Sequence, residues 1–172
     1  MLSQGKAVSD ILYLAAEGAP HVFRPPFSAL DGTKSMPDKK GYSFDGCSPA
    51  WLINKAEVKN GLITFPGGGS YRILVMPDLK TMTPELLNKI RSLAGSGALI
   101  AGNPPDRSPS LSGFPECDEQ IAAIAKEVWG SNTIPSGIAQ QYFGKGKILW
   151  GKRLVNKHKG ISNNPDSLGL YP

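Results

Sequence analysis

Short apolar runs alternate with longer amphipathic stretches along this chain. Four of the runs are rich in β-favouring residues and end at polar or turn-forming residues, namely 11–16 (ILYLAA), 71–78 (YRILVMPD), 98–103 (ALIAGN) and 147–150 (KILW). Apolar runs of this length are typical of strands buried on both faces of a sheet. The pattern therefore predicts a sheet built from these four runs.

The amphipathic stretches begin at recognisable helix caps. Thr83 followed by Pro84, and Ser48 followed by Pro49, are start signals, because a hydroxyl caps the first turn and proline fits its first position. A further helix is expected over residues 117–130. The two longer helices each carry one apolar face at helical spacing, formed by Leu86, Leu87, Ile90, Leu93 and Ala94 and by Ile121, Ile124, Ala125, Val128 and Trp129.

This order of elements predicts an α/β fold. Strands that alternate with helices of this length indicate βαβ units and a mostly parallel sheet covered on both faces. We therefore expect a three-layer sandwich of the flavodoxin-like type. Asn60-Gly61 indicates a hairpin turn between β-favouring residues. Residues 1–151 are expected to form one domain, and residues 152–172 a basic linker toward a further module.

Composition and charge exclude several classes of protein. The 172 residues suit a single domain, and 40% hydrophobic with 19% charged residues excludes a disordered chain. No apolar run approaches the roughly 20 residues of a membrane helix. The net charge is +5, and residues 144–172 hold six basic residues and one acid. Because no aromatic platform or groove-reading helix is interleaved with those lysines, we expect a solvated segment and no nucleic-acid or membrane partner.

Polar residues follow the predicted strands at their carboxyl ends, where open parallel sheets bind ligands. We expect them to form a rim for a ligand or for a neighbouring domain. The candidate residues are Glu17, Asp78 and Asn103 at the strand ends, with His21, Arg24, Asp45 and Arg107 in the loops.

Two cysteines are candidate nucleophiles. A cysteine nucleophile on an α/β sheet stands exposed on a sharp turn between strand and helix. Cys117 lies far along the chain from Asn103 among acidic neighbours, which disfavour a thiolate, and no strand is predicted directly before Cys47. Only His21 and His158 could serve as a base. We expect no catalytic residue, but a small cysteine-dependent hydrolase or amidotransferase-like enzyme using Cys47 or Cys117 with His21 is the alternative.

Other kinds of site have weak support. The glycine-rich segment PGGGSY (66–71) precedes a strand and is interpreted as a turn, because a phosphate loop would open a helix. Neither a metal site nor a cofactor is expected, since the histidines are isolated. A carbohydrate-binding module with Trp51, Trp129 or Phe114 as a stacking platform is a third hypothesis. Trp129 lies on an apolar helical face, which favours burial.

The amino-acid sequence resembles that of a known family. The segments GKAVSDILYLAAEGAPHVFRPP, YSFDGCSPAWLI, VKNGLITFPGGGSYRILVMPD, TMTPELLNKIRSLAGSGALIAGNPPDRSPSLSGFPECDEQI and GKGKILWG occur in this order. Together they resemble the middle region of bacterial glycoside hydrolase family 106 proteins, the α-L-rhamnosidase-like enzymes. The resemblance implies a glutamine-amidotransferase-like domain of flavodoxin-like fold that accompanies a catalytic barrel and β-sandwich modules. It implies a periplasmic or extracellular location.

The resemblance carries no catalytic residue over to this chain, because the family's carboxylates and metal site belong to the barrel. It implies a non-catalytic accessory domain that braces the barrel and contributes loops to carbohydrate recognition. The proline-rich loop 104–115 is expected to hold its shape, because each proline fixes its own φ and restricts the preceding residue. We predict that Arg107 or a loop serine bonds to segment 42–48 or 77–80.

Overall fold

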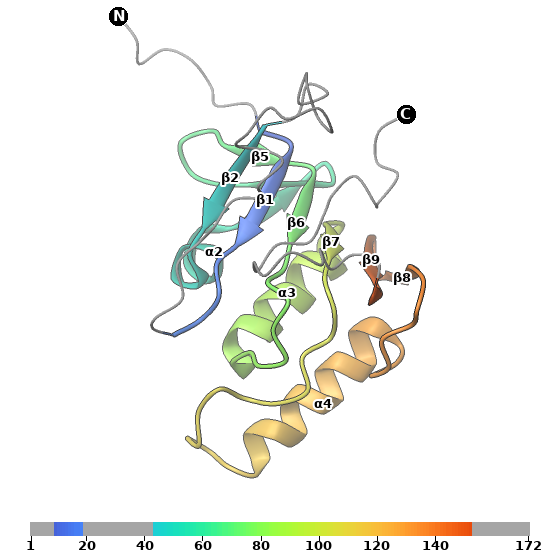
Figure 1. Cartoon of the computed structure of the whole chain (residues 1–172). Coiled ribbons are helices and arrows are strands. Elements are labelled where there is room, and N and C mark those ends of the chain that lie inside the picture. The colour runs from blue at the N-terminus through green and yellow to red at the C-terminus, as the bar shows by residue number, and fades with distance from the viewer. Residues whose placement is uncertain (1–8, 19–42, 153–172) are drawn as a thin grey trace, which may run out of the picture.

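The computed structural model describes residues 9–18 and 43–152, and its main feature is a six-stranded sheet (Figure 1). The strands lie in the order β2-β1-β6-β7-β9-β8. All neighbours are parallel except β8, which runs antiparallel to β9. The prediction of an α/β chain with a mostly parallel sheet is confirmed. The bounds are Ile11–Leu14 (β1), Phe44–Cys47 (β2), Ile73–Val75 (β6), Leu99–Ala101 (β7), Ala139–Phe143 (β8) and Gly146–Trp150 (β9).

A small antiparallel sheet of three strands accompanies the main one. It contains β3 (Glu57–Lys59), β4 (Leu62–Thr64) and β5 (Ser70–Tyr71), in that order. Asn60 and Gly61, between β3 and β4, have φ values of 53° and 77°. Two positive φ angles match the twist of a tight hairpin, and Asn and Gly tolerate them best. The hairpin predicted at Asn60-Gly61 is confirmed.

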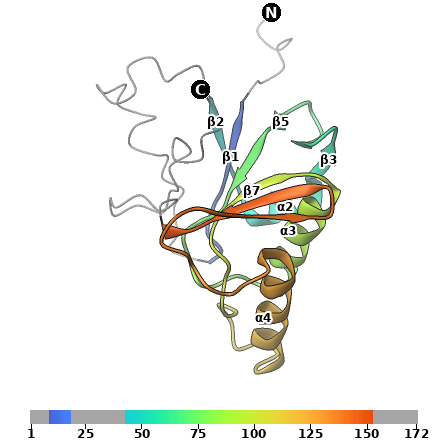
Figure 2. The same cartoon turned by 90° about the vertical axis from the view of Figure 1, so that its right-hand side faces the viewer.

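Three helices lie on one side of the main sheet (Figure 2). They are α2 (Pro49–Lys55), α3 (Pro84–Ser96) and α4 (Glu116–Trp129). The predicted caps are present: the Ser48 hydroxyl accepts a hydrogen bond from the Trp51 amide, and the Thr83 hydroxyl accepts one from the Leu86 amide, each at 3.3 Å. Each cap satisfies an amide that the first helical turn leaves unpaired.

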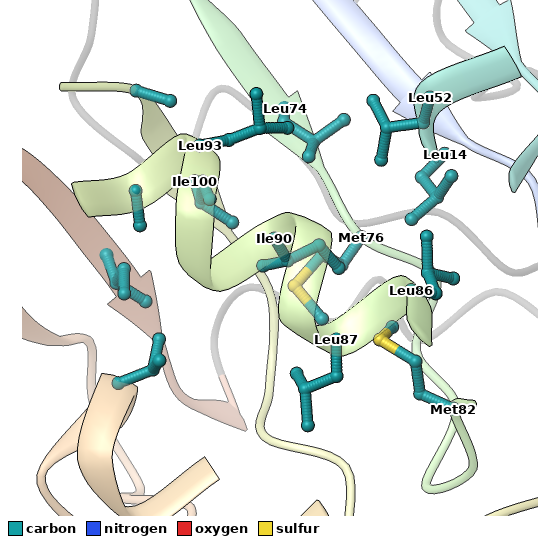
Figure 3. Close-up of a cluster of buried hydrophobic side chains, with 14 of the residues drawn as sticks. Leu14, Leu52, Leu74, Met76, Met82, Leu86, Leu87, Ile90, Leu93 and Ile100 are labelled. Atoms are coloured by element: carbon teal, nitrogen blue, oxygen red, sulfur yellow. The ribbon is translucent and has the colours of Figure 1, made fainter. Parts of the chain in front are cut away.

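The main core lies between these helices and the sheet (Figure 3). Leu74 and Ile100 from the sheet, with Met76 just after β6, pack in one cluster with the apolar face of α3. The predicted apolar faces of α3 and α4 are both buried. Trp129 is 1% exposed, and its indole N–H donates to the Gly102 carbonyl oxygen at 2.9 Å. The expected burial of Trp129 is confirmed. Truncating a leucine at such a site costs about 2–5 kcal/mol.

The opposite face of the sheet is buried as well. Ile11, Tyr13, Ile73, Val75 and Ala101 form a second cluster there, each at most 3% exposed. All four residues of β1 are consequently buried. Burial on both faces explains why residues 11–16 form a continuous apolar run without alternation.

Three expectations about the strands need correction. The run 71–78 is not one strand, because Tyr71 ends β5, where it pairs with Ile63, and Ile73 begins β6. Strand β8 was not predicted, since its sequence AQQYF reads as polar; an edge strand needs only one buried face. A strand does precede Cys47, because β2 ends at that residue. The segment FDGC contains a glycine and an acid, which weaken the strand signal.

Candidate functional site

The predicted rim is assembled in part. Strands β1, β6 and β7 are parallel neighbours, so Glu17, Asp78 and Asn103 follow them at one edge of the sheet. Asp45 lies within β2, beside Leu12 of β1, and not beyond the strand end. His21 and Arg24 lie outside the described residues.

Glu17 is bound to the start of helix α3. Its carboxylate accepts a hydrogen bond from the Thr83 amide at 2.7 Å and one from the Thr83 hydroxyl at 2.5 Å. The same hydroxyl caps the Leu86 amide. A helix N-terminus attracts anions because its first amides are unpaired and its dipole is positive there. Glu17 supplies that negative charge from within the chain.

Asp78 and Asn103 form a second internal connection at the same edge. The Asn103 amide group donates to the Asp78 carboxylate at 3.2 Å, and its carbonyl oxygen accepts from the Gly151 amide at 2.9 Å. Asn103 is 6% exposed. One buried side chain therefore links the ends of β6, β7 and β9, and both of its polar ends are engaged.

Asp45 has a partner on the small sheet. Its carboxylate accepts a hydrogen bond from the Tyr71 hydroxyl at 3.0 Å. Burial, together with the hydrogen bond to Asp45 and the charge of that carboxylate, raises the pKa of Tyr71 to about 12. Tyr71 is therefore a neutral donor at physiological pH. This bond joins the edge strand β2 to β5 and does not place Asp45 beside Asp78 in an acid–base pair.

Neither cysteine has the environment of a nucleophile. Cys47 and Cys117 are both buried and both free. Burial raises the pKa of the Cys47 thiol to about 11, and the thiol donates to the Ser48 carbonyl oxygen at 3.3 Å. The Cys117 thiol faces the Ser110 carbonyl oxygen and the Asp118 carboxylate. A reactive thiolate requires a lowered pKa and access to solvent.

The loop 104–115 contacts the sheet edge through its main chain. The Arg107 amide donates to the Lys80 carbonyl oxygen at 3.3 Å, and the Arg107 carbonyl oxygen accepts from the Met82 amide at 3.1 Å. The predicted contact between Arg107 and segment 77–80 is thus confirmed, although by backbone atoms. The Arg107 guanidinium pairs with its neighbour Asp106 at 3.1 Å.

The tip of this loop is apolar and exposed. Leu111 is 83% exposed and Phe114 is 59% exposed. The far end of the loop is bound to α4 because the Cys117 amide donates to the Gly113 carbonyl oxygen at 2.8 Å, and the Asp118 carboxylate of the same helix accepts from the Ser108 amide at 2.7 Å. Two large apolar side chains therefore project from a loop that is tied at both ends.

A second exposed aromatic surface lies over α2 and the small sheet. Trp51 is 50% exposed, and its ring is nearly parallel to that of Phe65, with centroids 6.4 Å apart. Beside Phe65 is a groove of about 410 Å³. The sequence named Trp51 as a candidate platform but gave no reason to join it to Phe65. The residues that line the groove are Lys55, Glu57, Lys59, Thr64, Phe65, Pro66, Gly68, Gly69 and Ser70.

Some classes of site are missing from the part of the chain that the structure covers. Among residues 9–18 and 43–152, no three His, Cys, Asp or Glu side chains gather as ligands for a metal ion. In the same residues, no helix combines the length and the apolar composition needed to cross a bilayer.

Comparisons with known proteins all match this chain to glycoside hydrolases. A protein of Formosa agariphila named "Putative beta-glucuronidase" is 34% identical over 134 residues, which is 78% of this chain and 11% of that protein. A rhamnosidase structure from Novosphingobium sp. PP1Y matches 84% of this chain and 13% of that one, with a TM-score of 0.61 and 23% identity. The latter shows a shared fold.

The chain thus spans a small fraction of the length of both relatives. The model of glycoside hydrolase family 106, described as α-L-rhamnosidase, matches residues 1–168, nearly the whole sequence. On this match the chain belongs to glycoside hydrolase family 106.

Proposed function

We propose that this chain is a non-catalytic accessory domain of a multidomain family 106 glycoside hydrolase, in which it braces the catalytic barrel and contributes to carbohydrate recognition. The family match and the small share of each relative that the chain covers support this proposal. Because the chain matches only 11% and 13% of these two relatives, most of each relative lies outside the matched domain.

The observation that carries the proposal is the hydrogen bonding at the carboxyl edge of the sheet. Glu17 occupies the N-terminus of α3, and Asn103 joins Asp78 to Gly151. A general acid and base need freedom to exchange protons with a substrate held beside them. Here the polar groups at the edge hold elements of the fold together.

We also propose a flavodoxin-like fold for the domain. Counted along the chain, the five parallel strands lie in the order 2-1-3-4-5 across the sheet, which is the order of flavodoxin-like sheets. Cys47 does end a strand directly before a helix, as an amidotransferase nucleophile would. Its burial and high pKa argue against the cysteine-dependent alternative.

The loop 104–115 is the part of the domain that we propose contacts the barrel. Leu111 and Phe114 are exposed at its tip, while its ends are bound to segment 80–82 and to α4. An anchored loop loses little conformational entropy on binding, and buried aromatic anchors contribute strongly to interfaces.

A hydrolysis assay of the whole 172-residue chain tests the non-catalytic role. We expect no release of nitrophenol from aryl α-L-rhamnosides or aryl β-D-glucuronides above the buffer rate. Turnover by the chain would contradict the proposal. Persistence of that turnover in the Cys47→Ala, Cys117→Ala double variant would exclude the cysteines as well.

A further inference from the structure

Trp51 differs from the other two tryptophans of the chain. Trp129 and Trp150 are 1% and 6% exposed, and both indole N–H groups donate to carbonyl oxygens. Trp51 is half exposed at the start of α2. A half-exposed tryptophan offers one of the largest flat apolar surfaces that a protein has.

A series of aromatic contacts supports the Trp51 ring. Phe65 lies nearly parallel to it, and the ring of Tyr71 meets Phe65 edge-on, with centroids 5.9 Å apart. The Tyr71 hydroxyl is bound to Asp45. Phe65 is therefore packed against Tyr71, whose hydroxyl is itself hydrogen-bonded. A ligand that stacks on this surface would restrict few side chains that are not already ordered, and this lowers the entropic cost of binding.

A glycine-rich turn forms one wall of the adjoining groove. The Gly68 amide donates to the Phe65 carbonyl oxygen at 3.2 Å, and the Phe65 amide donates to the Gly69 carbonyl oxygen at 3.0 Å. Gly67 and Gly68 have φ values of 99° and 98°, which only glycine adopts readily. The turn and the Phe65 backbone thus form one tight unit. The groove volume of about 410 Å³ lies in the usual range for small ligands.

Charged side chains also line the groove. Lys55 follows Trp51 by one helical turn and so lies on the same face of α2. Lys59 pairs with Glu57 at 2.9 Å, and this contact lowers the pKa of Glu57, which is ionised at neutral pH. Within the described residues, Lys55 has no such ion pair. Two ammonium groups and one carboxylate leave the groove with a positive balance.

This combination fits one class of ligand. A pyranose ring has an apolar C–H face that stacks on aromatic rings and a polar rim of hydroxyls that bonds to charged side chains. A uronic acid adds the carboxylate that Lys55 can pair with. We propose that Trp51, Phe65 and Lys55 bind an oligosaccharide that contains uronic acid. This rests on the proposed role in carbohydrate recognition and names its site and ligand class.

Tryptophan fluorescence of the whole chain provides the first test. Because Trp129 and Trp150 are buried, quenching by acrylamide reports chiefly on Trp51. We expect trigalacturonate to protect this fluorescence with a Kd on the order of 1 mM or tighter. The neutral analogue galactotriose should bind about tenfold more weakly, since it lacks the carboxylates.

Variants identify the surface by calorimetric titration with trigalacturonate. Trp51→Ala and Lys55→Ala should each weaken binding by about tenfold, the value of one lost contact near 1.4 kcal/mol. Tyr142→Ala removes an exposed aromatic side chain from strand β8, outside the residues that line the groove, and should bind as the wild type does. Circular dichroism confirms that each variant is folded.

Absence of protection by trigalacturonate, or equal binding by the Trp51→Ala variant, would overturn the site. Equal affinity for galactotriose would overturn the assignment to an acidic sugar. Hydrolysis of aryl glycosides is a separate readout: it would contradict the accessory role and leave this binding result unaffected.

Discussion

The carboxyl edge of the main sheet and the Trp51–Phe65 surface use their polar and aromatic groups differently. At the edge, Glu17 and Asn103 make two hydrogen bonds each to other parts of the chain. On the other surface, Trp51 is half exposed and Lys55 lies beside it over an open groove. A polar residue at a strand end is therefore poor evidence for a site unless its donors and acceptors remain free.

The physical reason lies in the architecture of parallel sheets. Each strand leads through a loop into a helix whose first amides need acceptors. The loops cross the edge where neighbouring strands end, so buried polar groups there must be paired within the chain. Glu17 and Asn103 meet these needs, and the edge becomes a place where the fold is fixed.

The largest effect is expected for Gly151, at the end of β9. Its φ is 141°, and a Cβ would lie 1.9 Å from the Gly137 carbonyl oxygen. Gly151→Ala should lower the free energy of unfolding by about 3 kcal/mol or more. Gly137→Ala is the matched control, because nothing lies within 4 Å of its added Cβ. Urea unfolding measures both, and similar values for the two variants would contradict the packing described at this edge.

Alkylation tests the state of Cys47, which ends β2 at the same edge. A pKa raised from 9.0 to about 11 reduces the thiolate fraction at pH 8 by about 100-fold. Iodoacetamide should therefore modify Cys47 about 100-fold more slowly in the folded chain than in urea. Mass spectrometry of the peptides separates it from Cys117. Equal rates in the two states would restore Cys47 as a candidate nucleophile.

The same shift gives a pH dependence of stability. Above pH 9 the unfolded Cys47 loses its proton while the folded thiol keeps it, so the free energy of unfolding should fall between pH 9 and 11. The slope reaches about 1.4 kcal/mol per pH unit. Tyr71 adds to this fall above pH 10. A stability that stays constant from pH 9 to 10 would contradict the buried thiol.

Asn103→Asp converts the internal connection into a repulsive pair. The new carboxylate would lie about 3 Å from Asp78, as the amide nitrogen now does. Like charges and burial raise the folded-state pKa of the pair, so stability is retained below about pH 4 and lost as the pH rises through that raised pKa. We expect a loss of about 2 kcal/mol at pH 7. Asn103→Leu should show no such recovery in acid.

Glu17→Ala should have a smaller effect. It removes two hydrogen bonds from Thr83 but leaves the Thr83 hydroxyl to cap α3, so we expect a loss of about 1–2 kcal/mol. Thr83→Ala removes the hydroxyl, so it loses one bond to Glu17 and the cap on the Leu86 amide but keeps the bond from its own amide to Glu17, and it should cost a similar amount. If Glu17→Ala were as stable as the wild type in urea unfolding, the role assigned to Glu17 at the start of α3 would be wrong.

Local sequence signals predicted the fold better than the site. The caps at Ser48 and Thr83 and the turn at Asn60-Gly61 depend on neighbouring residues, and all three are present. The contact between Trp51 and Phe65 depends on how α2 meets the small sheet, which no periodicity encodes. Glu17 lies 66 residues from its partner Thr83, so its structural role was equally hidden.

One comparison tests the central claim, that the edge serves the fold and the Trp51 surface is left for binding. Urea unfolding of the Glu17→Ala, Asn103→Ala variant should show a loss of about 2–4 kcal/mol, because buried partners lose their hydrogen bonds. The Trp51→Ala, Lys55→Ala variant should lose about 1 kcal/mol or less, since both side chains are exposed. Equal losses, or the larger loss in the second variant, would contradict the account.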